Sequence, residues 1–237
     1  MKQRDYQRSP ISLEKGAIFV SDVHYQKGVR ERFEPFLSHL LDDPPPQLFL
    51  MGDIFDLLVA QVDDTLQENQ RIIELLNRLA ASCQVIYLEG NHDFNLKSIF
   101  PAMMVVPRSK QPLIIDVESK RAALMHGDLF TGKIYEFYTT LIRNPVVLKV
   151  LNRLNKPLGI YKKIQNYNAS KVLCQKDVDL SRRQEELLKR FGVDLIIEGH
   201  FHQNILTSSY INLPAFACGE KFLRFDGSWW RCEEFVE

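Results

Sequence analysis

Five short apolar runs, each followed at once by a cluster of polar residues, most constrain what this chain can fold into. The runs with their polar ends are "AIFVSDVH", "QLFLMGDIFD", "QVIYLEGNHD", "RAALMHGD" and "DLIIEGHFH". Continuous apolar runs of this length are typical of strands that are buried on both faces of a central sheet. Because functional side chains of α/β proteins gather beyond the carboxyl ends of the strands, we expect the five polar clusters to meet at one edge of that sheet.

Segments with helical periodicity separate the runs and indicate an α/β architecture. We expect helices over residues 31–41, 64–81 and 181–191, the last with a capping start at Ser181. Short strand candidates follow residue 207 and are broken by Gly219 and Gly227. The chain contains no internal repeat, so we expect a single α/β domain over residues 1–237.

Composition excludes several classes of protein. With 30 basic and 30 acidic residues and 45% hydrophobic residues, the chain has no net charge that would indicate a nucleic-acid partner. The polar N-terminal stretch lacks the apolar core of a signal peptide, and no run reaches the roughly 18 apolar residues of a membrane span. Cys83, Cys174, Cys218 and Cys232 form no C-x-x-C pair, so we expect reduced cysteines that fill the core of a cytoplasmic protein.

The polar residues behind the runs are of the types that bind transition metals. Asp22 and His24 are two apart, so in an extended segment their side chains project to the same side. The full candidate set is Asp22, His24, Asp53, Asn91, His126, His200 and His202. Carboxylate, amide and imidazole together favour manganese, iron, zinc or nickel over calcium or magnesium. Seven ligands are too many for one zinc ion, so we expect two divalent ions, with manganese the first expectation, and one shared acid.

Small residues accompany these ligands. Gly52, Gly90, Gly127 and Gly199 each lie next to a candidate ligand. A side chain at these positions would crowd the turn, and a positive φ would favour glycine.

The order of the motifs D-x-H, G-D-x-x-D, G-N-H-D, H-G-D and G-H-x-H, between Asp22 and His202, resembles the calcineurin-like metallophosphoesterase superfamily. The resemblance implies a four-layer α/β/β/α sandwich with two metal ions. It also implies two ligand sets that share Asp53: one is Asp22, His24, Asp53 and His202, and the other is Asp53, Asn91, His126 and His200.

The resemblance further implies a phosphoesterase in which two metal ions clamp the phosphoryl group and activate water, without a protein nucleophile. His92 resembles the catalytic histidine of the family, which acts near the leaving-group oxygen. We expect Asp93 to hold the ring of His92 in its useful tautomer, and Asp56 to orient a ligand from behind.

The segment 130–176 is longer than a simple connection between two strands needs. Residues 130–175 contain eight basic residues and one acidic residue, so their net charge is +7 and that of the remainder is −7. The apolar residues of this insertion are too many for one helix face to bury. We expect a basic, amphipathic pair of helices that serves an anionic substrate with an apolar part or an anionic membrane surface. The alternative is a hairpin packed on its own domain with solvated lysines.

Within the superfamily, "HGDLFTGKIYEFYTTLIRNP" is most similar to the UDP-2,3-diacylglucosamine pyrophosphohydrolases of lipid A synthesis. These enzymes release UMP and 2,3-diacylglucosamine 1-phosphate, and their best-known members have arginine where this chain has His92. The resemblance implies an anionic amphipathic small-molecule substrate and a cytoplasmic protein in peripheral contact with the inner membrane. Candidate contacts to phosphate or glucosamine are Arg143, Asn144, Lys149 and Lys156, and candidate residues of an acyl groove are Tyr138, Leu141 and Val147.

Two other functional classes stay open. One is a general cytoplasmic phosphodiesterase or phosphatase that acts on nucleotides or other phosphoesters, with the insertion as an ordinary cap. The other is a non-catalytic scaffold, which would have no chemical need for the seven candidate ligands and His92. A nucleic-acid substrate is not expected, because the basic residues of the insertion accompany aliphatic rather than stacking aromatic neighbours.

Overall fold

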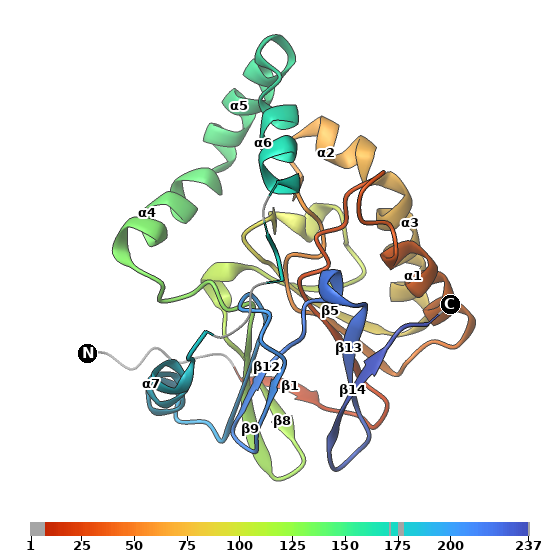
Figure 1. Cartoon of the computed structure of the whole chain (residues 1–237), viewed down its shortest axis with the longest axis vertical. Coiled ribbons are helices and arrows are strands. Elements are labelled where there is room, and N and C mark those ends of the chain that lie inside the picture. The colour runs from red at the N-terminus through yellow and green to blue at the C-terminus, as the bar shows by residue number, and fades with distance from the viewer. Residues whose placement is uncertain (1–7, 171, 175–177, 237) are drawn as a thin grey trace.

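A computed structural model of the chain describes residues 8–170, 172–174 and 178–236, without the side chains of residues 8–10, 133 and 156. Two six-stranded sheets form its centre (Figure 1). The strand order of the first is β1 (Arg8–Ser12), β8 (Leu113–Val117), β9 (Lys120–Met125), β10 (Leu195–Glu198), β12 (Tyr210–Asn212) and β11 (Ile205–Leu206). The order of the second is β14 (Trp230–Glu234), β13 (Lys221–Phe225), β2 (Ile18–Val20), β3 (Gln47–Leu50), β5 (Gln84–Leu88) and β7 (Met104–Val106). A separate two-stranded ladder pairs β4 (Leu58–Val59) with β6 (Asp93–Phe94).

Helices cover the outer face of each sheet and complete four layers. The helices α1 (Phe33–Asp42) and α3 (Gln70–Ser82) pack on the second sheet, and α7 (Ser181–Phe191) packs on the first. One apolar core lies between each sheet and its helices, and another fills the space between the two sheets. The predicted α/β/β/α sandwich is therefore confirmed.

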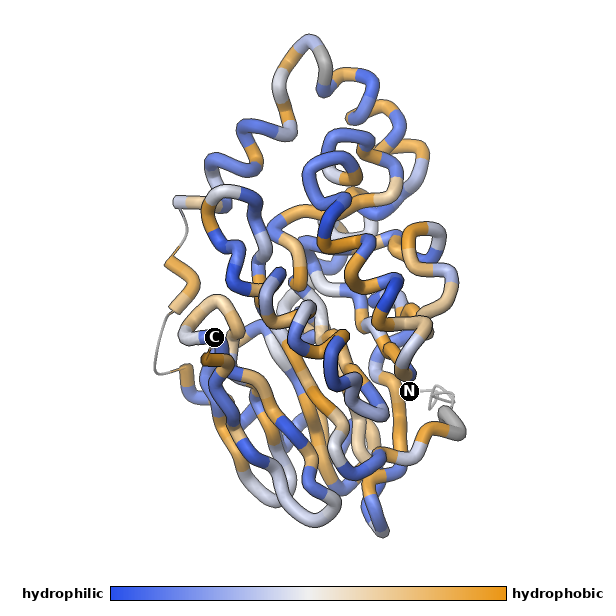
Figure 2. Tube along the Cα trace, turned by 90° about the vertical axis from the view of Figure 1, so that its right-hand side faces the viewer, coloured by the Kyte–Doolittle hydropathy of each residue, from blue (hydrophilic) through white to orange (hydrophobic). Residues whose placement is uncertain are grey.

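The five apolar runs form β2, β3, β5, β9 and β10, and the residues of these strands are buried apart from a few at their starts. They divide between the two sheets, so the expectation of one central sheet is wrong. Successive side chains of a strand point to opposite faces, and Figure 2 shows apolar residues concentrated along the strands. Phe19 accordingly stacks on Phe49 between the sheets at a ring distance of 4.3 Å, whereas Ile18 and Val20 face the helical layer.

Two predicted helix boundaries differ from the structure for local reasons. Residues 64–81 form two helices, α2 (Asp63–Glu68) and α3, because the chain leaves helical geometry at Asn69. The amide of Asn69 donates to the carbonyl oxygens of Leu57 and Thr65 at 3.1 and 2.8 Å, which fixes this break. Helix α7 begins at Ser181 as predicted, but the Ser181 side chain makes no capping bond, and the Ser181 N–H donates to Asp179 Oδ1 instead.

The insertion forms three helices rather than the expected pair. They are α4 (Lys133–Ile142), α5 (Pro145–Leu158) and α6 (Ile160–Ala169), and Figure 1 shows them rising beyond one end of the sandwich. Asn144 begins α5 by accepting hydrogen bonds from the N–H groups of Val146 and Val147. Gly159, with φ +59°, separates α5 from α6.

Polar contacts dock the insertion on the sandwich. Asn155 donates to Asp64 Oδ2 at 2.5 Å, and Tyr161 Oη donates to Glu68 Oε2 at 2.8 Å, so α5 and α6 both lie against α2. At the other end, the guanidinium of Arg108 donates to both carboxylate oxygens of Glu136 in α4 at 2.8 Å. Leu148 of α5 also packs with Val59 and Phe94 of the sandwich, so both polar and apolar contacts hold the insertion.

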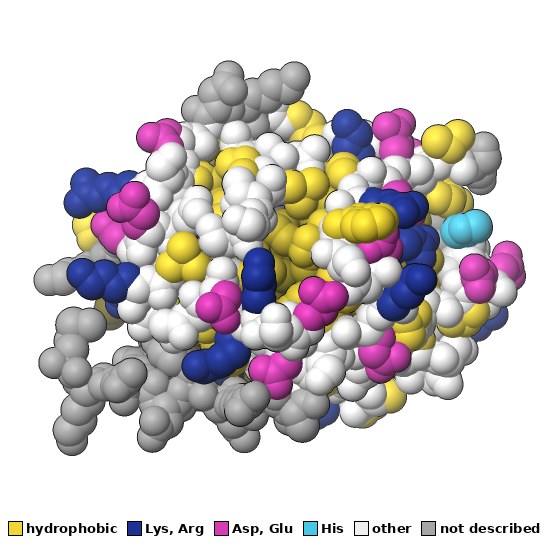
Figure 3. All heavy atoms as spheres, turned by 90° about the horizontal axis from the view of Figure 1, so that it is seen from below, with side chains coloured by type: hydrophobic (Ala, Val, Ile, Leu, Met, Phe, Trp, Pro, Cys, Tyr) yellow, Lys and Arg dark blue, Asp and Glu magenta, His cyan; other side chains and the backbone are white. Residues whose placement is uncertain are grey.

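Charge is distributed differently at the opposite end of the molecule. Figure 3 shows that end with basic and acidic side chains intermixed around an apolar centre. The insertion, by contrast, is nearly free of acidic residues. No helix in the described parts of the chain is long and apolar enough to cross a membrane.

Two cysteines depart from the prediction. Cys174, which follows α6, forms a disulfide with Cys218, whereas Cys83 and Cys232 are free. The expectation that all four cysteines are reduced core residues is therefore wrong for this pair. The two are 44 positions apart in sequence, and the fold alone brings them together.

We predict that breaking this disulfide lowers the free energy of unfolding by about 2–4 kcal/mol, because a long loop in the unfolded chain is no longer closed. Urea unfolding of oxidised Cys83→Ser/Cys232→Ser protein, with and without reductant, measures the difference. The same variant carrying Cys174→Ser serves as the control, since its stability should not respond to reductant. Two reactive thiols in the unfolded, unreduced protein would contradict the pairing.

Candidate metal centre

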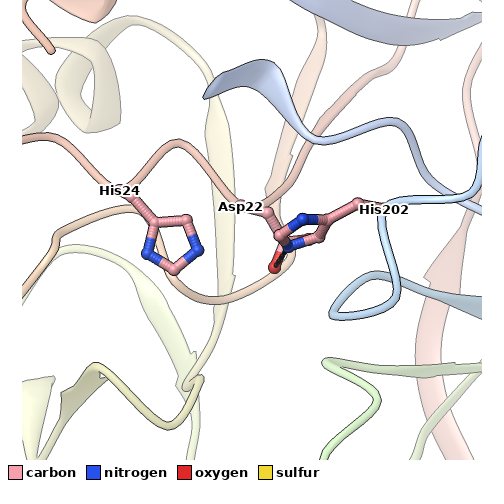
Figure 4. Close-up of side chains that lie close together, drawn as sticks. All are labelled: Asp22, His24 and His202. Carbon is pink, nitrogen blue, oxygen red and sulfur yellow. Dashed lines mark ion pairs between the residues drawn. The ribbon is translucent and has the colours of Figure 1, made fainter. Parts of the chain in front are cut away.

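The carboxyl ends of β2, β3 and β5 from one sheet, and of β9 and β10 from the other, converge on one site. Ligand-type atoms lie within 4.8 Å of one another in three groups: Asp22, His24 and His202; His24, Asp53 and His92; and Asp53, His126 and His200. Figure 4 shows His202 against Asp22, with the ring of His24 beside them. Asn91 joins the third group, because its Oδ1 is 3.2 Å from His126 Nε2. The structure therefore brings all seven predicted ligands together.

The backbone of the site is held in an uncommon conformation. Asp22, His24, Asp53, His200 and His202 all have positive φ, between 47° and 66°. This left-handed region costs a non-glycine residue about 1–2 kcal/mol. The expectation that Asp22 and His24 lie in an extended segment is therefore wrong, although both side chains enter the same site. Loop-to-loop hydrogen bonds hold the turns, such as His24 N to the Asp53 carbonyl at 2.9 Å and Gly199 N to the His126 carbonyl at 2.8 Å.

The four glycines next to the ligands leave room that a side chain would remove. A Cβ atom at Gly90 would lie 2.2 Å from Asp53 Oδ1, and one at Gly199 would lie 2.0 Å from Ser21 Oγ. At Gly52 and Gly127 the backbone φ of +87° and +125° also requires glycine. The predicted crowding is confirmed at these turns.

Backbone carbonyls orient two of the histidine rings. His126 Nδ1 is 2.9 Å from the Met51 carbonyl, and His202 Nδ1 is 2.6 Å from the Leu173 carbonyl. A carbonyl only accepts hydrogen bonds, so each Nδ1 carries a proton, and each Nε2 faces the site, where it can offer a lone pair once it is deprotonated. These Nε2 atoms lie 3.4 Å from Asp53 Oδ2 and 3.1 Å from Asp22 Oδ1, respectively.

Unpaired buried atoms test whether the residues fit a metal. The buried His24 Nδ1 has no hydrogen-bond partner among the described residues, and the buried Asp22 Oδ1 has none beyond its ion-pair contact with His202 Nε2. Such atoms are costly unless a ligand satisfies them. Asp53 Oδ2 lies between His126 Nε2, at 3.4 Å, and His24 Nε2, at 4.0 Å, as a shared acid would. The donor set fits divalent transition metals and is consistent with a binuclear site.

Burial and charge divide the histidines into two kinds. Burial lowers the pKa of His24 to about 3 and that of His200 to about 4. Burial opposes the charge of His126 and His202 too, but the carboxylate of Asp53 holds the pKa of His126 well above its usual value, and Asp22 raises the pKa of His202. At neutral pH the first two rings are already in the form that binds metals, whereas His126 carries a proton that a metal must displace.

Asp93 does not play the role predicted for it. Its carboxylate accepts hydrogen bonds from the backbone N–H groups of Gly90, Asp53, Ile54 and Phe55 and from Tyr87 Oη. It therefore ties the loop after β3 to the loop after β5. The ring of His92 is oriented instead by the backbone carbonyl of Asp56, 2.7 Å from Nδ1.

Sequence reasoning missed two residues that border the site. Asn168 in α6 is buried, and its amide donates to the Asp56 carbonyl at 3.2 Å and lies 3.4 Å from His92 Nδ1. Arg108 donates to Asp128 Oδ2 at 2.6 Å, directly behind the H-G-D turn. No local sequence pattern indicates that Asn168 or Arg108 borders the site, because their partners are distant in sequence. The one available signal was Asp128 in the H-G-D motif, whose carboxylate needs a partner.

Of the residues predicted to contact substrate, some lie close to the metal centre and others do not. Arg143 donates to the Gly90 carbonyl at 2.5 Å, next to Asn91. The side chain of Asn144 caps α5, Lys149 is exposed, and the side chain of Lys156 lies outside the described residues. Tyr138 lines a cavity of about 490 Å³ with Thr131, Gly132, Ile134 and Tyr135. Leu141 is exposed and Val147 is half-buried.

We predict that binding of Mn²⁺ at pH 7 releases protons from His126 and, to a smaller extent, from His202, because the pKa of each is raised in the metal-free protein. Raising the pH removes these protons beforehand, so the release falls. Calorimetric titration in buffers of different ionisation enthalpy measures it. Proton release that is unchanged in His126→Asn would contradict this assignment.

Comparison with known proteins identifies the family. Residues 17–204 match the family model described as calcineurin-like phosphoesterase. A UDP-2,3-diacylglucosamine hydrolase of Coxiella burnetii is 28% identical, over 89% of this chain and 94% of its own, and one of Chromohalobacter salexigens is 29% identical, over 78% and 79%. A solved structure of a Vps29 mutant from Entamoeba histolytica has 14% identity and a TM-score of 0.44, covering 93% of this chain and 99% of that one. Because the family model covers most of the chain, this protein belongs to the calcineurin-like phosphoesterases, which are metal-dependent hydrolases of phosphoric esters.

Proposed function

We propose that this enzyme hydrolyses the pyrophosphate of UDP-2,3-diacylglucosamine to UMP and 2,3-diacylglucosamine 1-phosphate. The observation that carries the proposal is the position of a basic, apolar insertion over a site of metal-ligand type. Two relatives that are similar over most of this chain are named for this substrate. Their similarity supports the choice of this substrate over other phosphoesters.

The proposed metal ligands follow the two groups of the site. Asp22, His24 and His202 would hold one divalent ion, Asn91, His126 and His200 the other, and Asp53 both. We propose manganese, while iron, zinc and nickel suit the same ligands. When bound, the two ions supply an activated water and neutralise charge on the phosphoryl group.

His92 is proposed as the residue that acts at the leaving-group oxygen. Its Nδ1 faces the Asp56 carbonyl, so Nδ1 carries a proton, and Nε2, on the other side of the ring, points away from that carbonyl. Its ring lies edge-on to that of His24 at 4.9 Å, which places it beside the candidate ligands. His92 is partly exposed, as a group that meets substrate must be.

The surface of the insertion supports an amphipathic substrate. Apolar side chains along α4 to α6 stay exposed, with exposed fractions of 88% for Ile134, 71% for Phe137, 69% for Val146 and 66% for Tyr167. Surfaces of this kind mark binding sites or contact with a membrane. The accompanying basic residues suit anionic headgroups, so we propose peripheral contact with the cytoplasmic face of the inner membrane. In that reducing compartment the Cys174–Cys218 pair would be largely in the thiol form.

We predict that manganese-loaded protein releases UMP from UDP-2,3-diacylglucosamine. Asp53→Ala should abolish the release, and His92→Ala should lower kcat by about 10²- to 10⁴-fold, because proton transfer to the leaving group is lost. His39→Ala, which changes an exposed histidine of α1, is the matched control. Hydrolysis of bis(p-nitrophenyl) phosphate without UMP release would refute the lipid substrate and favour a general phosphodiesterase.

We predict that Tyr138→Ser/Leu141→Ser raises KM for the diacyl substrate about 10-fold or more, because apolar contact with the acyl chains is lost. Hydrolysis of bis(p-nitrophenyl) phosphate should stay unchanged. Val236→Ser, at an exposed position outside the insertion, should alter neither reaction. Equal losses on the two substrates in the double variant would reject the acyl groove.

A further inference from the structure

Arg143, at the end of α4, carries a buried guanidinium group that its surroundings use only in part. Nη2 donates to the Gly90 carbonyl at 2.5 Å. Nε and Nη1 are also buried, and no hydrogen-bond acceptor for either atom occurs among the described residues. A buried donor without a partner is costly, and more so when the group is charged. The presence of two such donors on one side chain indicates that a ligand supplies their hydrogen-bond acceptors.

The guanidinium is held in place independently of any ligand. Its Cζ lies 4.9 Å from the centre of the Phe94 ring, a cation–π contact. The carbonyl oxygen of Arg143 accepts a hydrogen bond from Asn95 Nδ2 at 3.2 Å. Both partners belong to the segment that follows Asn91, so side chain and backbone are fixed against the same loop as the metal centre.

Charge around Arg143 favours an anion. Burial lowers the pKa of its guanidinium, whereas the carboxylate of Asp128 supports the charge. Asp128 bonds Arg108 through Oδ2, and Arg108 is also paired with Glu136. Asp128 Oδ1 is buried without a hydrogen-bond partner among the described residues, and it forms no hydrogen bond with Arg143, so Nε and Nη1 of Arg143 stay unused.

The location selects a particular anion. Gly90 directly precedes Asn91, so the Arg143 guanidinium contacts the residue next to a candidate metal ligand. The metals would hold one phosphoryl group, and a diphosphate carries a second phosphate next to it. A planar guanidinium binds phosphate oxygens through two parallel N–H groups.

We propose that Arg143 binds the second phosphate of a diphosphate substrate and makes the metal centre selective for diphosphates over simple phosphodiesters. This inference rests on the proposed phosphoesterase site but not on the acyl chains of the proposed substrate. It also gives the insertion a role beyond apolar contact, because α4 delivers the arginine.

The test compares binding of UDP and UMP to manganese-loaded protein by calorimetry at a fixed free Mn²⁺ concentration. The two nucleotides differ by one phosphate. Arg143→Gln should weaken UDP binding roughly 10- to 100-fold and UMP binding less than about 3-fold, as expected for loss of a hydrogen bond between charged groups. Arg143→Lys should recover only part of the UDP affinity, because lysine lacks the planar fork.

Arg153→Gln is the matched control, since it removes one exposed positive charge from α5 and should leave both affinities unchanged. Equal weakening of UDP and UMP in Arg143→Gln, or no weakening of either, would overturn the proposal. Should Arg143→Gln fail to fold, Arg143→Lys decides alone: undiminished preference for UDP would overturn the proposal. Selective loss of UDP affinity together with no UMP release from the lipid nucleotide would refute the substrate proposal and leave the role of Arg143 standing.

Discussion

The buried carboxylate of Asp93 is the constraint on which the rest of the site depends. Its five hydrogen bonds join the loop that carries Asp53 to the loop that carries Asn91 and His92. Burial and the nearby carboxylate of Asp53 raise the pKa of Asp93 to about 7, against the donated hydrogen bonds, which favour the ionised form. Without this carboxylate four backbone N–H groups at the centre of the molecule would lose their acceptor, and the two halves of the ligand set would lose their common support.

The same loops hold backbone strain that the fold must offset. Five candidate ligands occupy the left-handed region, and glycines at their flanks let neighbouring loops approach to distances that a Cβ atom would prevent. Such strain persists only where surrounding structure fixes it. Here the two sheets supply that structure: each turn follows a buried strand, and hydrogen bonds between the turns close the site. The insertion adds Asn168 and Arg143 from above, so the site draws on both the rigid sandwich and the covering helices.

The sequence predicts some of this well because the signals are local. Buried strands require apolar runs, and a metal ligand requires a particular residue type at the end of such a run, so both are visible in short motifs. The left-handed turns are not visible, since five of them occur at residues that rarely adopt this conformation. The role of Asp93, the break at Asn69 and the Cys174–Cys218 disulfide depend on which segments the fold brings together. Asn168 meets Asp56 across 112 positions, a contact that residue spacing cannot reveal. The motif therefore pointed to residues that do lie together around His92 but assigned the orienting contact to the wrong neighbour.

We propose that seven side chains bind two ions, with Asp53 shared between them. A crystal structure of manganese-loaded protein, with anomalous diffraction measured at the manganese absorption edge, tests it most directly. Two bound ions should give two anomalous peaks per chain, one beside Asp22, His24 and His202 and the other beside Asn91, His126 and His200, with the Asp53 carboxylate in contact with both. A single peak, or two peaks of which only one contacts Asp53, would rule out a binuclear site bridged by Asp53.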